Sequence, residues 1–249
     1  MHESEQFLLL TKTDADYSRG LLHYLETTRR RILSSLRGIA HDEGYGKHVA
    51  LIFDDGDDYL RYLAGFDTRE GEIGLSSGVF LGRGYGHLAM PFVHYDGAER
   101  TIAHEMTHAL VDHLPLPLWL NEGLATNMED QLTFGRNLLG TPEERAKHGR
   151  FWGEEEVQQF WSGESFGRAD EGQELSYELA QLAVKNLSQD YDDFVRFVEQ
   201  VHYRDAGEEA AQAVYEGSLG NLMAHYFGEG DWVPNPELWN WPEMEEARE

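Results

Sequence analysis

The sequence predicts an α+β protein with a small mixed sheet in its first half and helices in its second half. In the first 114 residues, short β-branched and aromatic runs alternate with segments whose apolar residues recur at helical spacing. Beyond that point, the periodic segments have helical spacing only. At 249 residues, with 41% hydrophobic residues, the chain is long enough to build a sizeable core as one large domain. We therefore expect a single domain over 1–249, made of an αβ lobe (1–114), a helical lobe (115–228) and a tail (229–249).

The first half should form four strands and three helices. The expected strands cover 7–11, 49–55, 74–82 and 86–95, and the expected helices cover 14–36, 57–65 and 98–113. The glycines of GRGYG supply the turn between the last two strands, which should therefore be neighbours. We expect Ser77–Leu81 to be an edge strand and the next strand to be interior, although Pro91 argues against an interior position.

The second half should be helical at 118–133, 142–162, 174–187, 191–203 and 208–228. The tail holds three of the six tryptophans among three prolines and ends in acidic residues. We expect these tryptophans to anchor the tail on the domain, and a recruitment motif is the alternative interpretation.

The charge and the missing cysteines exclude several classes of function. Twenty basic residues against 46 acidic ones give a formal charge of −26, which argues against nucleic-acid and membrane partners. The same charge would attract a basic peptide or protein substrate, although solubility or a salt-rich environment is the preferred explanation for it. The start of the chain lacks a signal-peptide pattern and no apolar run is long enough to span a membrane, so we expect a cytoplasmic protein. Without cysteine, a metal must be held by His, Asp or Glu; the oligomeric state is not determined by the sequence.

The segment HEMTH (104–108) has the spacing of a zinc site on a helix. At 100° per residue, His108 falls about 40° from His104 and Glu105 about 100° from it, while Met106 and its apolar neighbours lie behind. Two imidazoles one turn apart can occupy adjacent corners of a zinc tetrahedron, and the glutamate beside them can address a water molecule on the metal. The alternative is two surface histidines that share a helix face by chance.

Glu122 is the expected third ligand. It follows His108 by fourteen residues, on a helix that begins after the short proline-containing segment LPLP and can pack back on the first helix. Gly123 beside it would allow two helices to approach closely, at a helix-propensity cost of about 1 kcal/mol. A catalytic zinc needs three protein ligands and one open position, which this set provides.

HEMTHAL followed by LPLWLNEGLA resembles the gluzincin metallopeptidases, the group that includes the thermolysin and aminopeptidase N families, and especially the compact peptidase MA-like proteins. The motif pair covers residues 104–125. The resemblance implies a zincin-like fold with an active-site cleft between the αβ lobe and the helical lobe, Zn²⁺ held by His104, His108 and Glu122, and Glu105 as general base. It also implies an oxyanion donor on the helical lobe, for which Tyr177 is the candidate, with a core tyrosine as the alternative.

Two departures from the family pattern affect the surroundings of the metal. The third ligand comes about five residues earlier than in thermolysin and aminopeptidase N. Thermolysin also has an aspartate four positions after the glutamate ligand that orients a histidine, whereas this chain has Thr126. Asp112, one turn beyond His108, is the expected substitute, with an exposed helix-end acid as the alternative.

The expected function is hydrolysis of peptide bonds by a zinc-bound water that Glu105 activates. The GAMEN-like segment that anchors the substrate amine in aminopeptidases is absent, with SSGVF in roughly its place, so an endopeptidase is slightly favoured. A catalytically silent, zinc-stabilised binding or scaffold protein with the same fold is the alternative function.

Overall fold

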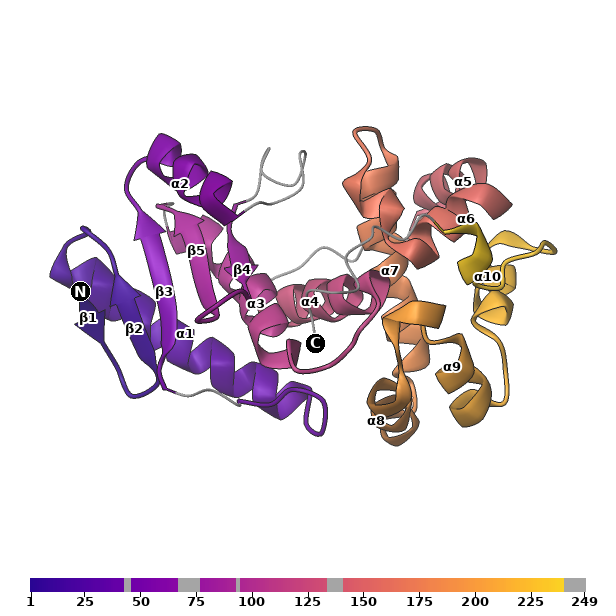
Figure 1. Ribbon diagram of the computed structural model, residues 1–249, viewed down its shortest axis with the longest axis horizontal. Helices are drawn as coiled ribbons and strands as arrows, with labels where there is room; N and C mark the ends of the chain where they lie inside the picture. Colours follow the sequence, from indigo (N-terminus) through magenta and orange to yellow (C-terminus); the bar gives the residue numbers. More distant parts are fainter. Residues whose placement is uncertain (43–45, 67–76, 93–94, 134–140, 240–249) are drawn as a thin grey trace. The chain divides into compact units, whose positions relative to one another are not determined.

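The computed structural model describes residues 1–42, 46–66, 77–92, 95–133 and 141–239. The chain folds as a mixed α+β protein in which helices predominate (Figure 1). It forms two compact units, the first from residues 1–114 and 124–136 and the second from residues 115–123 and 137–249. Helix α4 (Leu118–Leu132) therefore contributes to both units.

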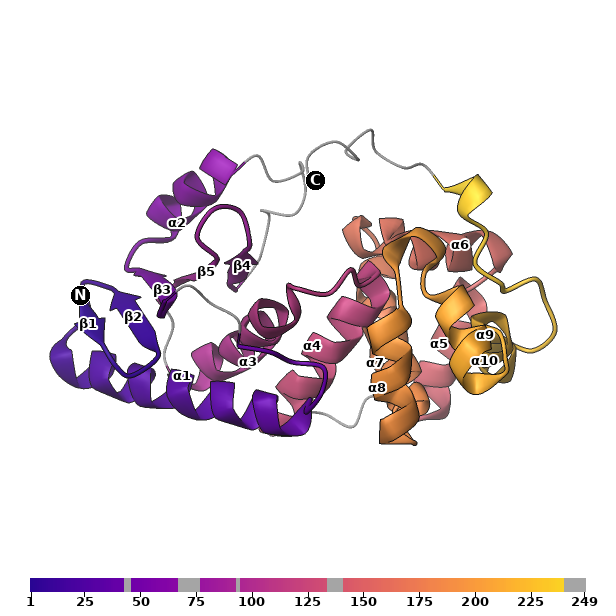
Figure 2. The same ribbon diagram turned by 60° about the horizontal axis from the view of Figure 1, so that its bottom comes forward.

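The first unit contains a five-stranded mixed sheet with helices on both faces (Figure 2). Its elements are β1 (His2–Glu3), β2 (Phe7–Leu10), α1 (Ala15–Ser35), β3 (His48–Phe53), α2 (Gly56–Leu63), a 3₁₀ turn (Ala64–Phe66), β4 (Val79–Leu81), β5 (His87–Pro91) and α3 (Tyr95–Val111). The strand order is β1-β2-β3-β5-β4. The three central strands are parallel, and β1 and β4 pair antiparallel at the two edges. Figure 2 shows α1 and α3 on one side of the sheet and α2 on the other.

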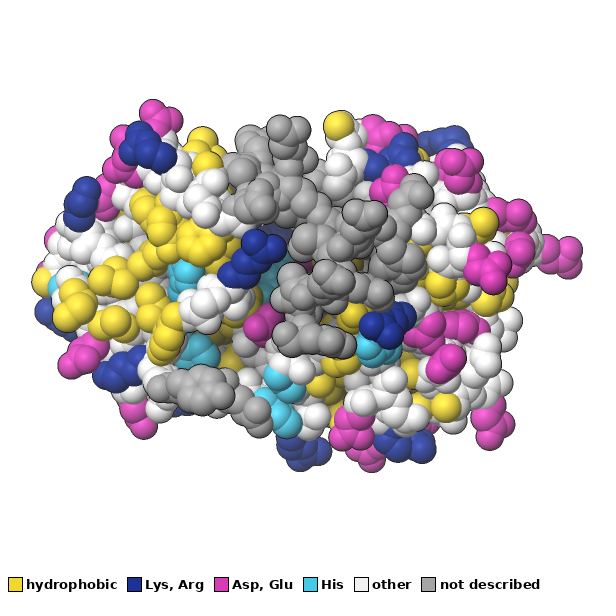
Figure 3. Space-filling view, in the orientation of Figure 1, with side chains coloured by type: hydrophobic (Ala, Val, Ile, Leu, Met, Phe, Trp, Pro, Cys, Tyr) yellow, Lys and Arg dark blue, Asp and Glu magenta, His cyan; other side chains and the backbone are white. Residues whose placement is uncertain are grey.

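The two faces of the sheet differ in how completely helices cover them. Alternate residues of β2 and β3 are buried, among them Phe7, Leu9 and Ala50, which are fully inaccessible. On the opposite face, α2 packs Tyr59 and Leu63 against β4 and β5. Over β2 and β3 this face shows apolar side chains at the surface (Figure 3), and Leu10 is 38% exposed.

The sequence predicts most elements of this unit correctly. The predicted strand at 74–82 lies partly outside the described residues, and its described part contains β4, which is the expected edge strand. β5 is interior, between β3 and β4, and Pro91 is tolerated because it is the last residue of the strand. The two-residue strand β1 was not predicted because a segment of two residues carries no periodicity.

The second unit is helical around an aromatic core. Its further elements are α5 (Pro142–Phe151), α6 (Glu154–Ser162), α7 (Gly172–Leu187), α8 (Tyr191–Gln200), α9 (Glu208–Tyr215), α10 (Leu219–Phe227) and 3₁₀ turns at Glu164–Gly167, Tyr203–Asp205 and Pro236–Leu238. Trp119 and Trp161 pack edge to face with ring centroids 5.6 Å apart, and Trp119 donates its indole N–H to the carbonyl oxygen of Ala206. Trp232 and Trp239 are buried, so the part of the tail up to residue 239 is anchored by aromatic side chains as the sequence predicts.

Two predicted helices are each divided into two in the structure. The 142–162 segment breaks at Trp152 and Gly153, where the backbone is extended and the Glu156 carboxylate accepts the Gly153 N–H to start α6. The 208–228 segment breaks at Glu216, which has a left-handed φ of 53°, and α10 then starts at the Ser218 cap. Continuous helical periodicity of the apolar residues concealed both breaks.

The surface is consistent with the strongly acidic composition. On the face shown in Figure 3, acidic side chains are scattered over both units. Within the described ranges, none of the helices is both long and apolar enough to cross a membrane. The cytoplasmic location stays a prediction.

Candidate metal centre

Helix α3 presents two histidines on one side and an apolar surface on the other. Ile102, Ala103 and Met106 are completely buried, which fixes the rotation of the helix against the sheet. His104 and His108 are half-buried, and their rings are 4.8 Å apart in an edge-to-face arrangement. The periodicity of the sequence thus places both imidazoles on the front of the helix.

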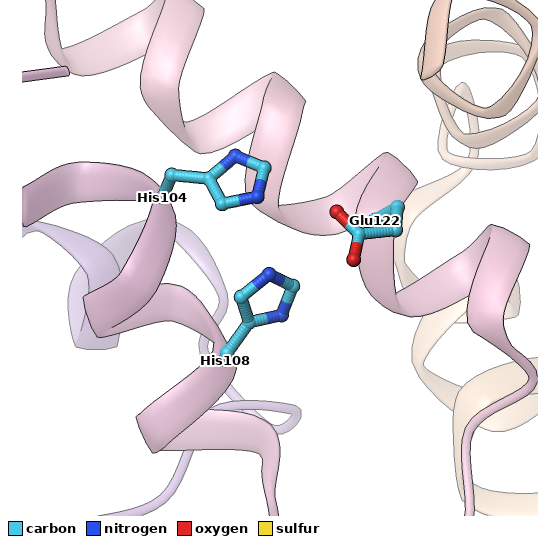
Figure 4. A group of neighbouring side chains, drawn as sticks. All are labelled: His104, His108 and Glu122. Atoms are coloured by element: carbon cyan, nitrogen blue, oxygen red, sulfur yellow. The ribbon is translucent and has the colours of Figure 1, made fainter. Parts of the chain in front are cut away.

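Helix α4 brings Glu122 to the two histidines (Figure 4). The helix follows Pro117, whose carbonyl oxygen accepts the N–H of Asn121. One ligand atom each from His104, His108 and Glu122 lies within 4.8 Å of the others. A tetrahedral zinc ion with bonds of about 2.0–2.1 Å holds its ligand atoms about 3.3 Å apart, so small side-chain rotations would close this set. Two imidazoles and one carboxylate are also a donor set typical of catalytic zinc.

Gly123 allows α4 to lie against α7 right beside Glu122. A Cβ atom at this glycine would be 2.6 Å from the carbonyl oxygen of Ala180 and 2.7 Å from a methyl group of Val184. Both distances are shorter than any normal contact, so only glycine fits without movement of the helices. Gly123 is thus a point of close helix approach, but the nearest atoms belong to α7, whereas the sequence interpretation concerned the packing of α4 on the histidine helix.

Glu129 is an acid in contact with a histidine of the site, and its position was not predicted from the sequence. Its Oε2 lies 3.3 Å from His104 Nδ1, and its Oε1 accepts a hydrogen bond from Nε of Arg100 and forms an ion pair with the same guanidinium. Burial disfavours the charged form of Glu129, but the hydrogen bonds and positive charges of His104 and Arg100 outweigh this and lower the pKa of Glu129. A carboxylate on Nδ1 fixes the tautomer and the orientation of the ring and leaves Nε2 for a metal.

The position of Glu129 on the same helix face as Glu122 could have been predicted from their spacing in the sequence. Glu122 and Glu129 are seven residues apart, so they fall within about 20° of each other on α4. Asp112, the acid expected in this role, is exposed, and its carboxylate lies beside Gly82. Within the described part of the chain, Asp112 makes no hydrogen bond to His104 or His108, so this expectation is corrected.

Glu105, the expected base, lies on α3 next to His104 and is only 9% exposed. Its Oε2 accepts a hydrogen bond of 2.7 Å from the backbone N–H of Phe80 in the edge strand β4. The side chain is therefore held at a defined place beside the edge strand.

Tyr177, the expected oxyanion donor, lies on α7 one turn before the close contact with Gly123. It shares one face of α7 with Val184, which is seven residues later and touches the same glycine position. Its ring packs edge-on against Phe166, with centroids 5.2 Å apart. Its role in catalysis stays a prediction.

In comparisons with known proteins, no family model, no curated protein and no solved structure matches this chain. The interpretation of the site therefore depends on its own geometry. The resemblance to gluzincins is carried by the motif pair in the sequence alone.

Two other histidines near the motif, His87 and His113, are in contact with neighbouring polar or aromatic groups. His87 is buried, with Nε2 2.8 Å from the Tyr62 hydroxyl and Nδ1 2.7 Å from the carbonyl oxygen of Tyr85. His113 stacks on His41 with ring centroids 4.8 Å apart. His94, also considered in the sequence, lies outside the described residues.

Thr126 places a buried hydroxyl between Glu122 and Glu129 on the same face of α4. Among the described residues, its Oγ1 has no hydrogen-bond partner. Thr107 and Thr133 behave differently, because each donates its hydroxyl hydrogen to the carbonyl oxygen four residues earlier. The Thr126 hydroxyl is therefore an unsatisfied buried polar group in the helix that carries Glu122.

Proposed function

We propose that this protein is a zinc-dependent peptidase of the gluzincin type, with a zincin-like fold in a single catalytic domain. One observation carries the proposal: His104, His108 and Glu122 come together from two consecutive helices, with Glu105 on the same turn of α3 as the first histidine. A structural zinc site has no need for a glutamate beside its ligands, and it fills its fourth position with protein.

The expected roles of the side chains are those of peptide-bond hydrolysis. A bound zinc ion supplies a Lewis acid that polarises a carbonyl group and acidifies water. Oε2 of Glu105 accepts the Phe80 N–H, which holds the carboxylate in place, and the carboxylate would accept a proton from the attacking water. As the C–N bond breaks, the same carboxyl group passes this proton to the leaving amine. Tyr177 lies on the face of α7 that contacts α4. Its hydroxyl would donate a hydrogen bond to the negative charge that develops on the carbonyl oxygen of the scissile peptide bond.

The edge strand β4 would receive the substrate. An extended peptide can add to a free sheet edge through its main chain, which gives affinity with little dependence on side chains. Among the described strands, β4 lies at an edge of the sheet, and it contacts Glu105 directly. The formal charge of −26 favours basic peptides, so cleavage of cationic peptides should exceed that of anionic ones and the difference should shrink as salt is raised.

The test combines metal analysis with cleavage of a peptide library. The purified protein should hold about one zinc ion per chain and cleave part of the library. Glu105→Gln should keep the zinc and lose cleavage, whereas His108→Ala should lose both. If Glu105→Gln kept full activity, the proposed base would be wrong.

The alternative function, a zinc-stabilised binding or scaffold protein, gives a different result in the same experiment. Zinc would be bound and would raise the melting temperature, yet neither library peptides nor lysate proteins would be cleaved. A comparison of lysate proteins treated with wild type and with Glu105→Gln would also separate a protease with one partner from a general peptidase.

A further inference from the structure

The edge strand β4 uses one of its main-chain donors to hold a side chain of α3. The N–H of Phe80 donates to Oε2 of Glu105 over 2.7 Å. Glu105 is 9% exposed, and the bond is partly shielded from water. Hydrogen bonds to an ionised carboxylate are about twice as strong as neutral ones, and burial strengthens them further.

The strand is fixed along α3 on both sides of this bond. Before it, the Thr101 hydroxyl donates to the Ser77 hydroxyl over 2.9 Å, and a Cβ at Gly78 would lie 2.4 Å from a methyl group of Thr101. After it, the Asp112 carboxylate lies against the Cβ position of Gly82. The glycines on either side of Phe80 thus let the strand approach the helix closely enough for the amide to reach Glu105.

The direction of this amide follows from the strand pairing. Phe80 is opposite Leu88 in the antiparallel pair of β4 with β5. Because its N–H goes to Glu105, this is a non-hydrogen-bonded pair, in which the N–H and C=O of Phe80 both point away from β5. The N–H on the open edge is engaged by Glu105, and the C=O on the same edge can accept an N–H from an added strand.

We propose that the Phe80 N–H is a positioning group for the base. On the edge of β4, the N–H of Phe80 then serves catalysis, and the C=O of Phe80 serves substrate binding. The amide keeps Oε2 of Glu105 in place and so fixes the orientation of the carboxylate that acts as base. An antiparallel peptide binds through the Phe80 C=O only, and the peptide carbonyl opposite Phe80 has no donor on β4. This carbonyl is therefore free to be the one that reacts. The kinetic part of this proposal depends on the peptidase function, whereas the hydrogen bond itself does not.

Hydrogen exchange of the Phe80 amide in the metal-free protein tests the bond without any turnover. After treatment with a chelator, the amide should exchange at least about tenfold more slowly in wild type than in Glu105→Ala, as expected for a bond to a charged group. Glu105→Gln keeps an acceptor oxygen and should give an intermediate rate. Equal rates in wild type and Glu105→Ala would overturn the proposal.

Phe80→Pro tests the role of the bond in catalysis, because proline removes the N–H and keeps the C=O. An edge strand tolerates proline where the N–H is not part of the ladder. We expect kcat to fall by about 10- to 100-fold, since a displaced catalytic group is costly, with KM changed by less than about twofold. Phe80→Ala is the matched comparison, because it removes the ring and keeps the amide, so kcat should fall far less than in Phe80→Pro.

The split between kcat and KM separates this role from simple substrate binding. If the Phe80 N–H bound the substrate instead, Phe80→Pro would raise KM and leave kcat unchanged, which would overturn the proposal. If Phe80→Pro does not fold, the exchange rates of wild type and the Glu105 variants still decide. A protected Phe80 amide without any peptide cleavage would instead contradict the proposed function and leave the hydrogen bond established.

Discussion

Replacement of Gly123 by alanine should disturb the contact that places Glu122. The new Cβ would lie 2.6 Å from the carbonyl oxygen of Ala180, whereas normal contacts between carbon and oxygen begin above 3 Å. A backbone oxygen in the middle of α7 cannot turn aside as a flexible side chain can, so the two helices have to separate.

The size of the effect follows from two opposing contributions. Forcing a methyl group into a packed region costs about 1–3 kcal/mol, and contact with a backbone atom places this site near the upper end. Alanine instead of glycine inside a helix contributes about 1 kcal/mol of stability. The free energy of unfolding should therefore fall by about 2 kcal/mol, which corresponds to a decrease in Tm of about 4–8 °C for a chain of this size.

Gly149 provides a control for the same substitution. It lies in α5, and a Cβ there would have no atom within 4 Å among the described residues. Gly149→Ala should raise the free energy of unfolding by up to about 1 kcal/mol, opposite in sign to Gly123→Ala. Urea titrations of both variants measure this, and competition with a chelator should show weaker zinc binding for Gly123→Ala only. If Gly123→Ala were as stabilising as Gly149→Ala, the close approach of the helices would be refuted.

Glu129→Gln removes the negative charge behind His104 and should weaken zinc binding by about 10- to 100-fold in a chelator competition; an unchanged affinity would show that the contact has no influence on the metal. Thr126→Val replaces an unsatisfied buried hydroxyl by a methyl group, so the free energy of unfolding in urea should rise by roughly 1–3 kcal/mol. Thr126→Ser, which keeps the hydroxyl, should show no such gain. A loss of stability in Thr126→Val would contradict the conclusion that the Thr126 hydroxyl has no hydrogen-bond partner. Removal of zinc should lower Tm, because a ligand at 100 times its Kd stabilises the folded state by about 2.7 kcal/mol. His108→Ala should melt at the same temperature with and without zinc, and a persistent shift would mean that the metal binds elsewhere.

The sequence predicts those parts of the fold and site that depend on local periodicity. The faces of α3 follow from 3.6-residue spacing, and Glu122 could be placed because only a short segment separates its helix from His108. The breaks at Gly153 and Glu216 could not be predicted, since they depend on caps and one left-handed residue rather than on the apolar pattern. The hydrogen bond between the Phe80 N–H and Glu105 also could not be predicted, because it depends on how β4 is placed in the sheet.

The short connection between α3 and α4 explains why the supporting acid is Glu129. α3 ends at Val111 and α4 begins at Leu118, so the second helix runs back antiparallel to the first. Later positions on α4 therefore face earlier positions on α3, and Glu129 meets both Arg100 and His104. At a rise of 1.5 Å per residue, seven residues carry the carboxylate about 10 Å beyond Glu122. That displacement brings it behind the imidazole of His104 instead of beside the metal position. The acid that contacts His104 therefore lies two turns beyond Glu122 rather than one.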